Sequence, residues 1–119
     1  MKLSTAEHFL DNHPSLNPLP INSRRIEESY TSGHETPRGR HLILDRQGVR
    51  LFVENSFDPS SIVLSSSESR YEHYGPDRKR ADVGRASVRL AGPKNGRKGA
   101  DTVCFKLDNV KDLQAVVDA

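Results

Sequence analysis

The sequence contains no tryptophan, a single cysteine and few aromatic residues, and these shortages limit what the protein can be. Aromatic residues make up 6% and hydrophobic residues 34% of the 119 positions, so the chain can build only one modest core. Cys104 has no second cysteine to pair with, which excludes an intramolecular disulfide and argues against a secreted, disulfide-rich scaffold. At this length we expect a single domain over residues 1–119.

Long apolar segments are also missing. No segment approaches the roughly 20 apolar residues that a membrane-spanning helix needs, and residues 1–14 lack the apolar stretch of a secretory signal peptide. We therefore expect a soluble cytoplasmic protein with no membrane partner. Because long polar tracts leave a small core, we also expect the protein to bury a further face in a homo-oligomer.

The sequence lacks every recognised spacing of catalytic or metal-binding residues. His8 and His13 lie five positions apart, about 140° around a helix, which is too far to share a tetrahedral metal ion. HExxH, CxxC, G-x-S-x-G and the glycine patterns of nucleotide-binding loops are all absent. We therefore predict no metal site, no cofactor and no catalytic residue, and we interpret Cys104 as a small buried residue of a strand.

Two short helices are predicted near the N-terminus. The first begins with a capping box from Ser4 to Glu7 and ends before Pro14. The second is expected over residues 24–32, where apolar residues recur one helical turn apart, and a loop is expected over 33–39.

β-branched and alternating runs predict an antiparallel sheet of about five strands. The clearest signal is a hairpin of residues 41–44 and 49–53, whose connection opens with Asp45 and closes with Gly48. This composition is typical of a type I turn followed by a residue with positive φ. Further strands are expected at residues 61–64, 86–90 and 102–107, the last two joined by a hairpin turn at Asn95-Gly96.

The connection after residue 64 and the C-terminus complete the predicted fold. The serine-rich residues 65–69 suggest a flexible linker. A C-terminal helix is expected after Asp108 or Asn109 as its N-cap, with Lys111 facing outward. Its buried stripe is expected to consist of Val110, Leu113, Val116 and Val117. The predicted class is α+β, with the antiparallel sheet packed by short N-terminal helices and one C-terminal helix.

Positive charge concentrates in one segment, from Arg70 to Lys98. This basic segment has nine Lys or Arg against three Asp or Glu, a local charge of +6, whereas the whole chain carries +2. Nucleic acids and other polyanions bind Lys and Arg through their phosphates, and exposed bases stack on aromatic side chains. The candidate binding residues are therefore Tyr71, Tyr74, Arg78, Lys79, Arg80, Arg85, Arg89, Lys94, Arg97 and Lys98.

The sequence leaves three kinds of function open. The first is a non-enzymatic module that binds nucleic acid or another polyanion through the basic segment. The second is an oligomeric protein-interaction module in which that segment is only a solvated loop, as the small net charge of +2 would suit. The third is a small enzyme in which His41 or His73 meets a carboxylate of Glu54 or Glu72.

Overall fold

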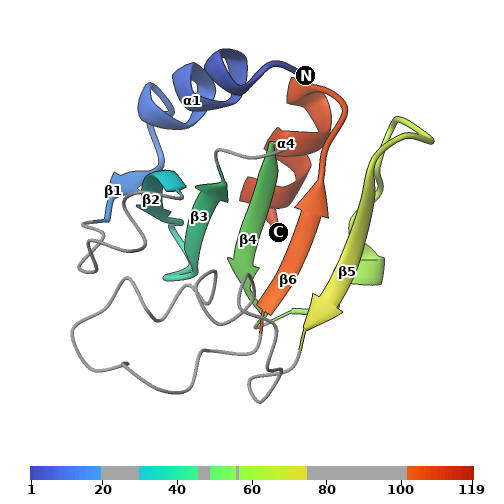
Figure 1. The fold of residues 1–119 in the computed structure, drawn as a ribbon. Coiled ribbons are helices and arrows are strands. Elements are labelled where there is room, and N and C mark those ends of the chain that lie inside the picture. Colours follow the sequence, from blue (N-terminus) through green and yellow to red (C-terminus); the bar gives the residue numbers. More distant parts are fainter. Residues whose placement is uncertain (20–29, 46–48, 56, 75–101) are drawn as a thin grey trace.

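The protein is built around an antiparallel sheet with one helix near each end of the chain (Figure 1). The computed structural model describes residues 1–19, 30–45, 49–55, 57–74 and 102–119. The elements in chain order are α1 (Leu3–Asp11), β1 (Asn17–Pro18), β2 (Tyr30–Glu35), β3 (His41–Asp45), β4 (Arg50–Glu54), η1 (Pro59–Ser61), β5 (Arg70–Tyr74), β6 (Thr102–Lys106) and α4 (Val110–Asp118). The predicted α+β class with an antiparallel sheet is confirmed.

The strands of the sheet follow the order β1-β2-β3-β4-β6-β5. The predicted hairpin forms β3 and β4, with Leu42 opposite Val53 and Leu44 opposite Leu51. After β4 the chain does not form the neighbouring strand of the sheet. It forms β5 one position further out and leaves the place between β4 and β5 for β6. Because β6 comes later and pairs with both β4 and β5, strands distant in sequence become neighbours.

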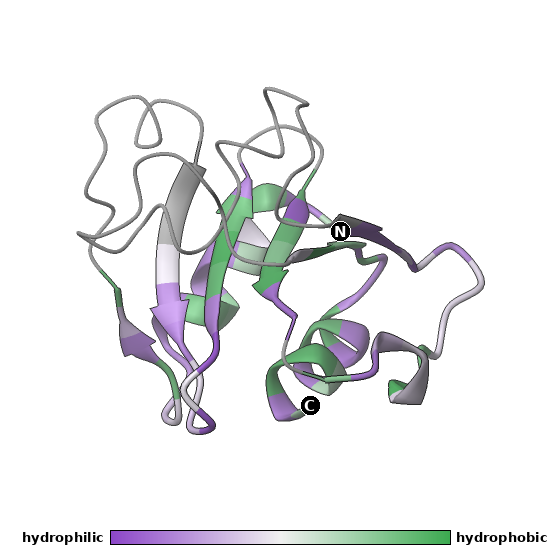
Figure 2. Cartoon of the chain, turned by 90° about the horizontal axis from the view of Figure 1, so that it is seen from below, coloured by the Kyte–Doolittle hydropathy of each residue, from purple (hydrophilic) through white to green (hydrophobic). Residues whose placement is uncertain are grey.

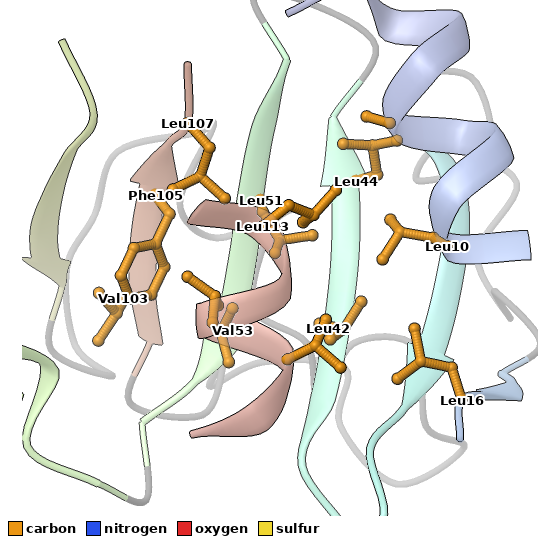
Figure 3. Packing of buried hydrophobic residues seen from close by; sticks show 13 residues of the cluster. Leu10, Leu16, Leu42, Leu44, Leu51, Val53, Val103, Phe105, Leu107 and Leu113 are labelled. Carbon is orange, nitrogen blue, oxygen red and sulfur yellow. The ribbon is translucent and has the colours of Figure 1, made fainter. Parts of the chain in front are cut away.

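Both helices cover the same face of the sheet, and the main core lies between them and the strands. Leu10 of α1 and Leu113 of α4 meet the side chains of the central strands there (Figure 3). Figure 2 shows the C-terminal helix against the hydrophobic stretches of these strands. The buried cluster comprises Ala6, Leu10, Leu16, Leu42, Leu44, Leu51, Val53, Val103, Phe105, Leu107, Leu113, Val116 and Val117.

The centre of the opposite sheet face is also buried. Ile43, Phe52 and Cys104 lie side by side on β3, β4 and β6, because the register pairs Ile43 with Phe52 and Phe52 with Cys104. Their exposed fractions are 0%, 0% and 7%. Cys104 is therefore a buried strand residue that faces away from the helix-covered core, as its alternation with Phe105 predicts.

The first helix forms as predicted, but its start differs. Lys2 is the N-cap and makes no side-chain cap, while the amides of Thr5 and Ala6 donate to the Lys2 carbonyl. Ser4 thus lies inside the first turn, and the capping box predicted from Ser4 to Glu7 is wrong. Starting the helix at Leu3 lets that side chain pack against the core cluster.

The predicted helix over residues 24–32 is wrong at its C-terminal end. Residues 30–32 belong to β2, and residues 24–29 lie outside the described segments. The strand continues through Gly33 to Glu35, where a loop was expected, and pairs with β3 along this length. Pairing with a buried strand outweighs the weak helical pattern of the local sequence.

The strand predicted at residues 61–64 is also wrong. Asp58 accepts a hydrogen bond from the Ser60 amide at 3.0 Å and begins the 3₁₀ turn η1. Val63 is 87% exposed, whereas Ile62 and Leu64 pack against the core. Buried and exposed side chains therefore alternate along this segment although it forms no strand. The strand predicted at residues 86–90 and its turn lie outside the described residues.

The C-terminal helix is confirmed with two changes on its buried face. Asn109 is the N-cap, and its side-chain oxygen accepts from the Asp112 amide at 2.8 Å. Leu113 is buried and Lys111 is exposed, as predicted. Val110, predicted to be buried, is 36% exposed. Asp112, which the sequence pattern did not indicate, is buried, with 1% of its surface exposed. None of the helices in the described segments is long and apolar enough to span a membrane.

Leu113 should carry a large share of the stability of this core. It is 1% exposed between α4 and the strands, so Leu113→Ala should lower the free energy of unfolding by about 2–5 kcal/mol through lost contacts and a residual cavity. Val63→Ala is the control, because the Val63 side chain is 87% exposed and its removal should change stability by less than about 0.5 kcal/mol. Chemical denaturation measures both, and equal effects would contradict this description of the core.

Candidate anion-binding site

Three basic residues lie in one row across β4, β6 and β5. Lys106 pairs with Arg50 on one side and with Arg70 on the other. Residues directly opposite in an antiparallel pair point to the same face, with their Cβ atoms about 4.5–5.5 Å apart. Since Phe105 points into the helix-covered core, its neighbour Lys106 points to the opposite face. We call Arg50, Lys106 and Arg70 the cationic row.

The charges of the cationic row are only partly compensated. The Arg50 guanidinium donates from Nε to the buried carboxylate of Asp45 at 2.8 Å and lies 5.3 Å from the centre of the Phe52 ring. Lys106 and Arg70 are exposed, and neither forms an ion pair with another residue of the described segments. Like charges directly opposite on a sheet repel each other, so an anion bound at Lys106 and Arg70 would remove an unfavourable interaction.

A hollow of about 280 Å³ borders this row. It lies at the end of the sheet where β4 and β5 begin and β6 ends, and Figure 1 shows these ends of the strands. Its lining combines apolar, basic and acidic side chains from Met1, Val49, Glu68, Arg70, Lys106, Leu107 and Asp108. The Asp108 carboxylate accepts a hydrogen bond from the Ser66 hydroxyl at 2.8 Å. Arg70 and Lys106 can bind an anion here, while the carboxylate of Glu68 beside them weakens the attraction between the hollow and an anion.

Val49 at the rim of this hollow has an unusual backbone. Its φ of 50° lies in the left-handed region, which β-branched residues rarely adopt. The sequence assigned a positive φ to the end of this turn, at Gly48, which lies outside the described residues. The Val49 side chain packs against the core and lines the hollow.

The buried carboxylate of Asp112 fixes the loop that leads into Arg70. One of its oxygens accepts from the amide and hydroxyl of Ser65 at 2.6 and 2.7 Å. The other accepts from the Ser69 hydroxyl at 2.5 Å and the Ser66 amide at 3.2 Å. The prediction of a flexible linker over residues 65–69 is therefore wrong, because these serines bind a charge on α4.

These hydrogen bonds keep Asp112 ionised. Burial by itself raises the pKa of this carboxyl, but the hydrogen bonds from Ser69, Ser65 and Ser66 outweigh it and lower the pKa from 3.8 to about 2. The Ser69 hydroxyl also accepts from the Asp108 amide at 2.9 Å. The start of β5 is thus held to both α4 and the end of β6.

The structure describes two of the binding residues that the sequence predicted. Tyr71 pairs with Phe105, and their rings pack at 5.9 Å, which places Tyr71 on the helix-covered face with 41% of it exposed. Tyr74 ends β5 opposite Thr102. The other candidates lie outside the described residues: Arg78, Lys79, Arg80, Arg85, Arg89, Lys94, Arg97 and Lys98.

Sequence analysis missed Arg50 and Lys106 as parts of a site. Alternation along each strand does indicate that Lys106 points away from Phe105 and Arg50 away from Leu51. What it does not indicate is that β6 inserts between β4 and β5, because pairing between strands about 50 residues apart leaves no local signal.

The histidines considered for catalysis do not share a site. His41 Nε2 lies 3.0 Å from the carboxylate of Glu35, on the face that carries Ile43. His73 pairs with Val103 on the other face, and its Nε2 lies 3.2 Å from the Asn55 side-chain amide. In the described ranges, no group of three or more His, Cys, Asp or Glu is arranged to hold a metal ion.

Known proteins do not identify this site. Comparison of the chain with protein families, with curated proteins and with solved structures gives no match. The function of the cationic row therefore has to be inferred from its own geometry and charge.

Removing the Asp112 charge should destabilise the protein. Asp112→Ala leaves the donors of three serines without their acceptor, and should lower the free energy of unfolding by about 2 kcal/mol or more. Asp118→Asn on the exposed side of α4 is the control and should have little effect. Loss of less than about 0.5 kcal/mol in the Asp112 variant would contradict the anchoring role.

The same carboxylate should contribute to acid sensitivity. The unfolded chain binds a proton near the ordinary pKa of 3.8, whereas the folded protein binds it near 2, so this contribution is intact above about pH 5 and is lost between about pH 4 and pH 2. It amounts to roughly 2 kcal/mol. Urea denaturation between pH 7 and pH 2 should show a smaller acid loss in Asp112→Asn than in the original protein.

Proposed function

We propose that the protein binds nucleic acid or another polyanion through the cationic row together with the rest of the basic segment after Arg70. The observation that carries the proposal is the direct opposition of Lys106 and Arg70, which are exposed and lack a described counter-ion. Phosphates attract both side chains, and their binding releases condensed counterions. Arg70 can in addition donate two parallel hydrogen bonds to one phosphate.

The connectivity of the sheet supports a polymeric ligand. Residues 75–101, which contain the rest of the basic segment, follow Tyr74 of β5 and precede Thr102 of β6, so they connect the two strands that carry Arg70 and Lys106. Arg70 and Tyr74 are four residues apart on β5, which corresponds to about 13 Å along a strand. A strand of nucleic acid that follows β5 and β6 spans this length, whereas a small anion does not.

The described part of the surface suits contacts to the phosphates of a nucleic acid better than recognition of its bases. Tyr71 lies on the face opposite to Arg70, and its ring already packs on Phe105. Its exposed part remains a place for one base to stack at the sheet edge, in addition to phosphate contacts on the other face. We therefore expect strong salt dependence and little sequence preference.

Neutralising the two uncompensated cations tests the proposal. In fluorescence anisotropy with labelled single-stranded DNA, Arg70→Gln combined with Lys106→Gln should weaken binding. It should also reduce the slope of log K against log salt by about 1.4, or about 0.7 for each lost phosphate contact. Glu68→Gln should strengthen binding, because it removes a carboxylate beside the same cations. Lys111→Gln is the control, since Lys111 is exposed on α4, which covers the other face of the sheet.

Different outcomes assign the function differently. If the double variant binds like the original protein while Arg78, Lys79 and Arg80 are required, the basic segment acts without the cationic row. If single strands, duplex DNA and RNA all fail to bind even at low salt, the proposal is wrong. The homo-oligomeric interaction module then becomes the hypothesis to test, by sedimentation at several protein concentrations.

A further inference from the structure

His34 is a buried histidine whose one described polar contact is to the end of α1. It lies on β2 with 3% of its surface exposed, and its Nε2 is 3.3 Å from the carboxylate of Asp11, the last residue of the helix. The Asp11 side chain itself is 56% exposed. The contact therefore joins the end of α1 to the sheet at the boundary between the core and solvent.

A second histidine holds the turn that follows the same helix. His13 Nε2 lies 3.1 Å from the side-chain oxygen of Gln114 on α4, and the Phe9 ring meets the His13 ring edge-on at 5.3 Å. Beyond this turn, Leu16 is buried in the core cluster. The end of α1 is thus attached to both β2 and α4 by imidazole contacts.

The environment of His34 favours its neutral form. In that form Nε2 faces the Asp11 carboxylate at 3.3 Å, while Nδ1 is buried and has no hydrogen-bond partner among the described residues. A second proton would place an N–H group at Nδ1 without an acceptor, which is unfavourable in a buried site. Burial accordingly lowers the pKa of His34 from 6.5; the charge and hydrogen bond of Asp11 oppose this, and the charge of His13 adds to it.

In the part of the chain that the structure describes, the charges that act on His34 come from two residues. Asp11 comes from α1 and His13 from the turn after it. On the neighbouring strands, Pro18 of β1 and Leu42 of β3 stand opposite His34, and neither can titrate. Gln114, the residue of α4 that reaches this turn, is neutral. The protonation of His34 is therefore governed mainly by its burial and by Asp11.

We infer that His34 and Asp11 form a pH-sensitive latch, which holds α1 on the sheet at neutral pH and holds it less firmly on acidification. A state with α1 released exposes His34, which then takes up a proton near pH 6.5. Since the docked state binds this proton only at lower pH, the latch is fully effective above about pH 6.5 and weakens as the pH falls below that value. Release exposes Ala6 and Leu10, which are 0% and 1% exposed in the docked state.

Hydrogen exchange of the whole chain, followed by mass spectrometry, tests the latch. After correction for intrinsic rates, the protection of residues 3–11 should fall by up to about tenfold between pH 7.5 and pH 5.5, while residues 41–54 keep theirs. His34→Gln retains an amide donor for Asp11 but cannot titrate, so the extra loss at pH 5.5 should disappear. His8→Gln is the control, since His8 lies exposed on α1 and should leave the pH response intact.

Three results would overturn the inference. They are an unchanged protection of α1 at pH 5.5, an equal loss over residues 41–54, and the same pH response in His34→Gln as in the original protein. An NMR titration of the His34 ring gives a second measurement on the unaltered chain. A midpoint below 6.5 is expected, and a midpoint at or above 6.5 would equally overturn the latch.

Discussion

The buried charge of Asp112 is the constraint on which the arrangement of the candidate site depends. An ionised carboxylate inside a protein is stable only when its oxygens accept hydrogen bonds, and here Ser65, Ser66 and Ser69 supply them. These bonds fix the loop that carries the chain past β6 to the start of β5. Arg70 begins β5 immediately after this loop, so its position opposite Lys106 follows from a contact on the other side of the sheet. A polar interaction in the core thus determines which charges meet at the surface.

The sheet face away from the helices changes character along the strands. Its centre is apolar and buried at Ile43, Phe52 and Cys104. At one end Glu35 and His41 pair across β2 and β3, whereas the cationic row lies at the other end. The basic segment attaches at the end opposite to this row, after Tyr74. The apolar centre of this face thus separates the cationic row from the pair of Glu35 and His41.

How much the sequence predicts depends on whether a signal is local. The hairpin of β3 and β4, the strand at Thr102–Lys106 and the helix after Asn109 are all confirmed, because alternation, turn composition and caps act over a few residues. The helix predicted over residues 24–32 and the strand over 61–64 fail where pairing and packing with distant segments decide the conformation. The site follows the same rule: the excess of positive charge is visible in the composition, but the opposition of Lys106 and Arg70 results from the strand order.

The N-terminal helix links the hollow beside the cationic row to the contact between His34 and Asp11. Met1, just before α1, lines the hollow beside Arg70, and Asp11 at the end of α1 contacts His34. Consider a ligand that contacts Met1 in the hollow and loses this contact when α1 leaves the sheet. By linkage, the binding of such a ligand stabilises the state in which α1 is docked on the sheet. A ligand that touches only Lys106 and Arg70 has no such effect, because both lie on strands. Since the docking of α1 weakens below about pH 6.5 in this scheme, the pH dependence of binding separates a ligand that enters the hollow from one that lies on the cationic row.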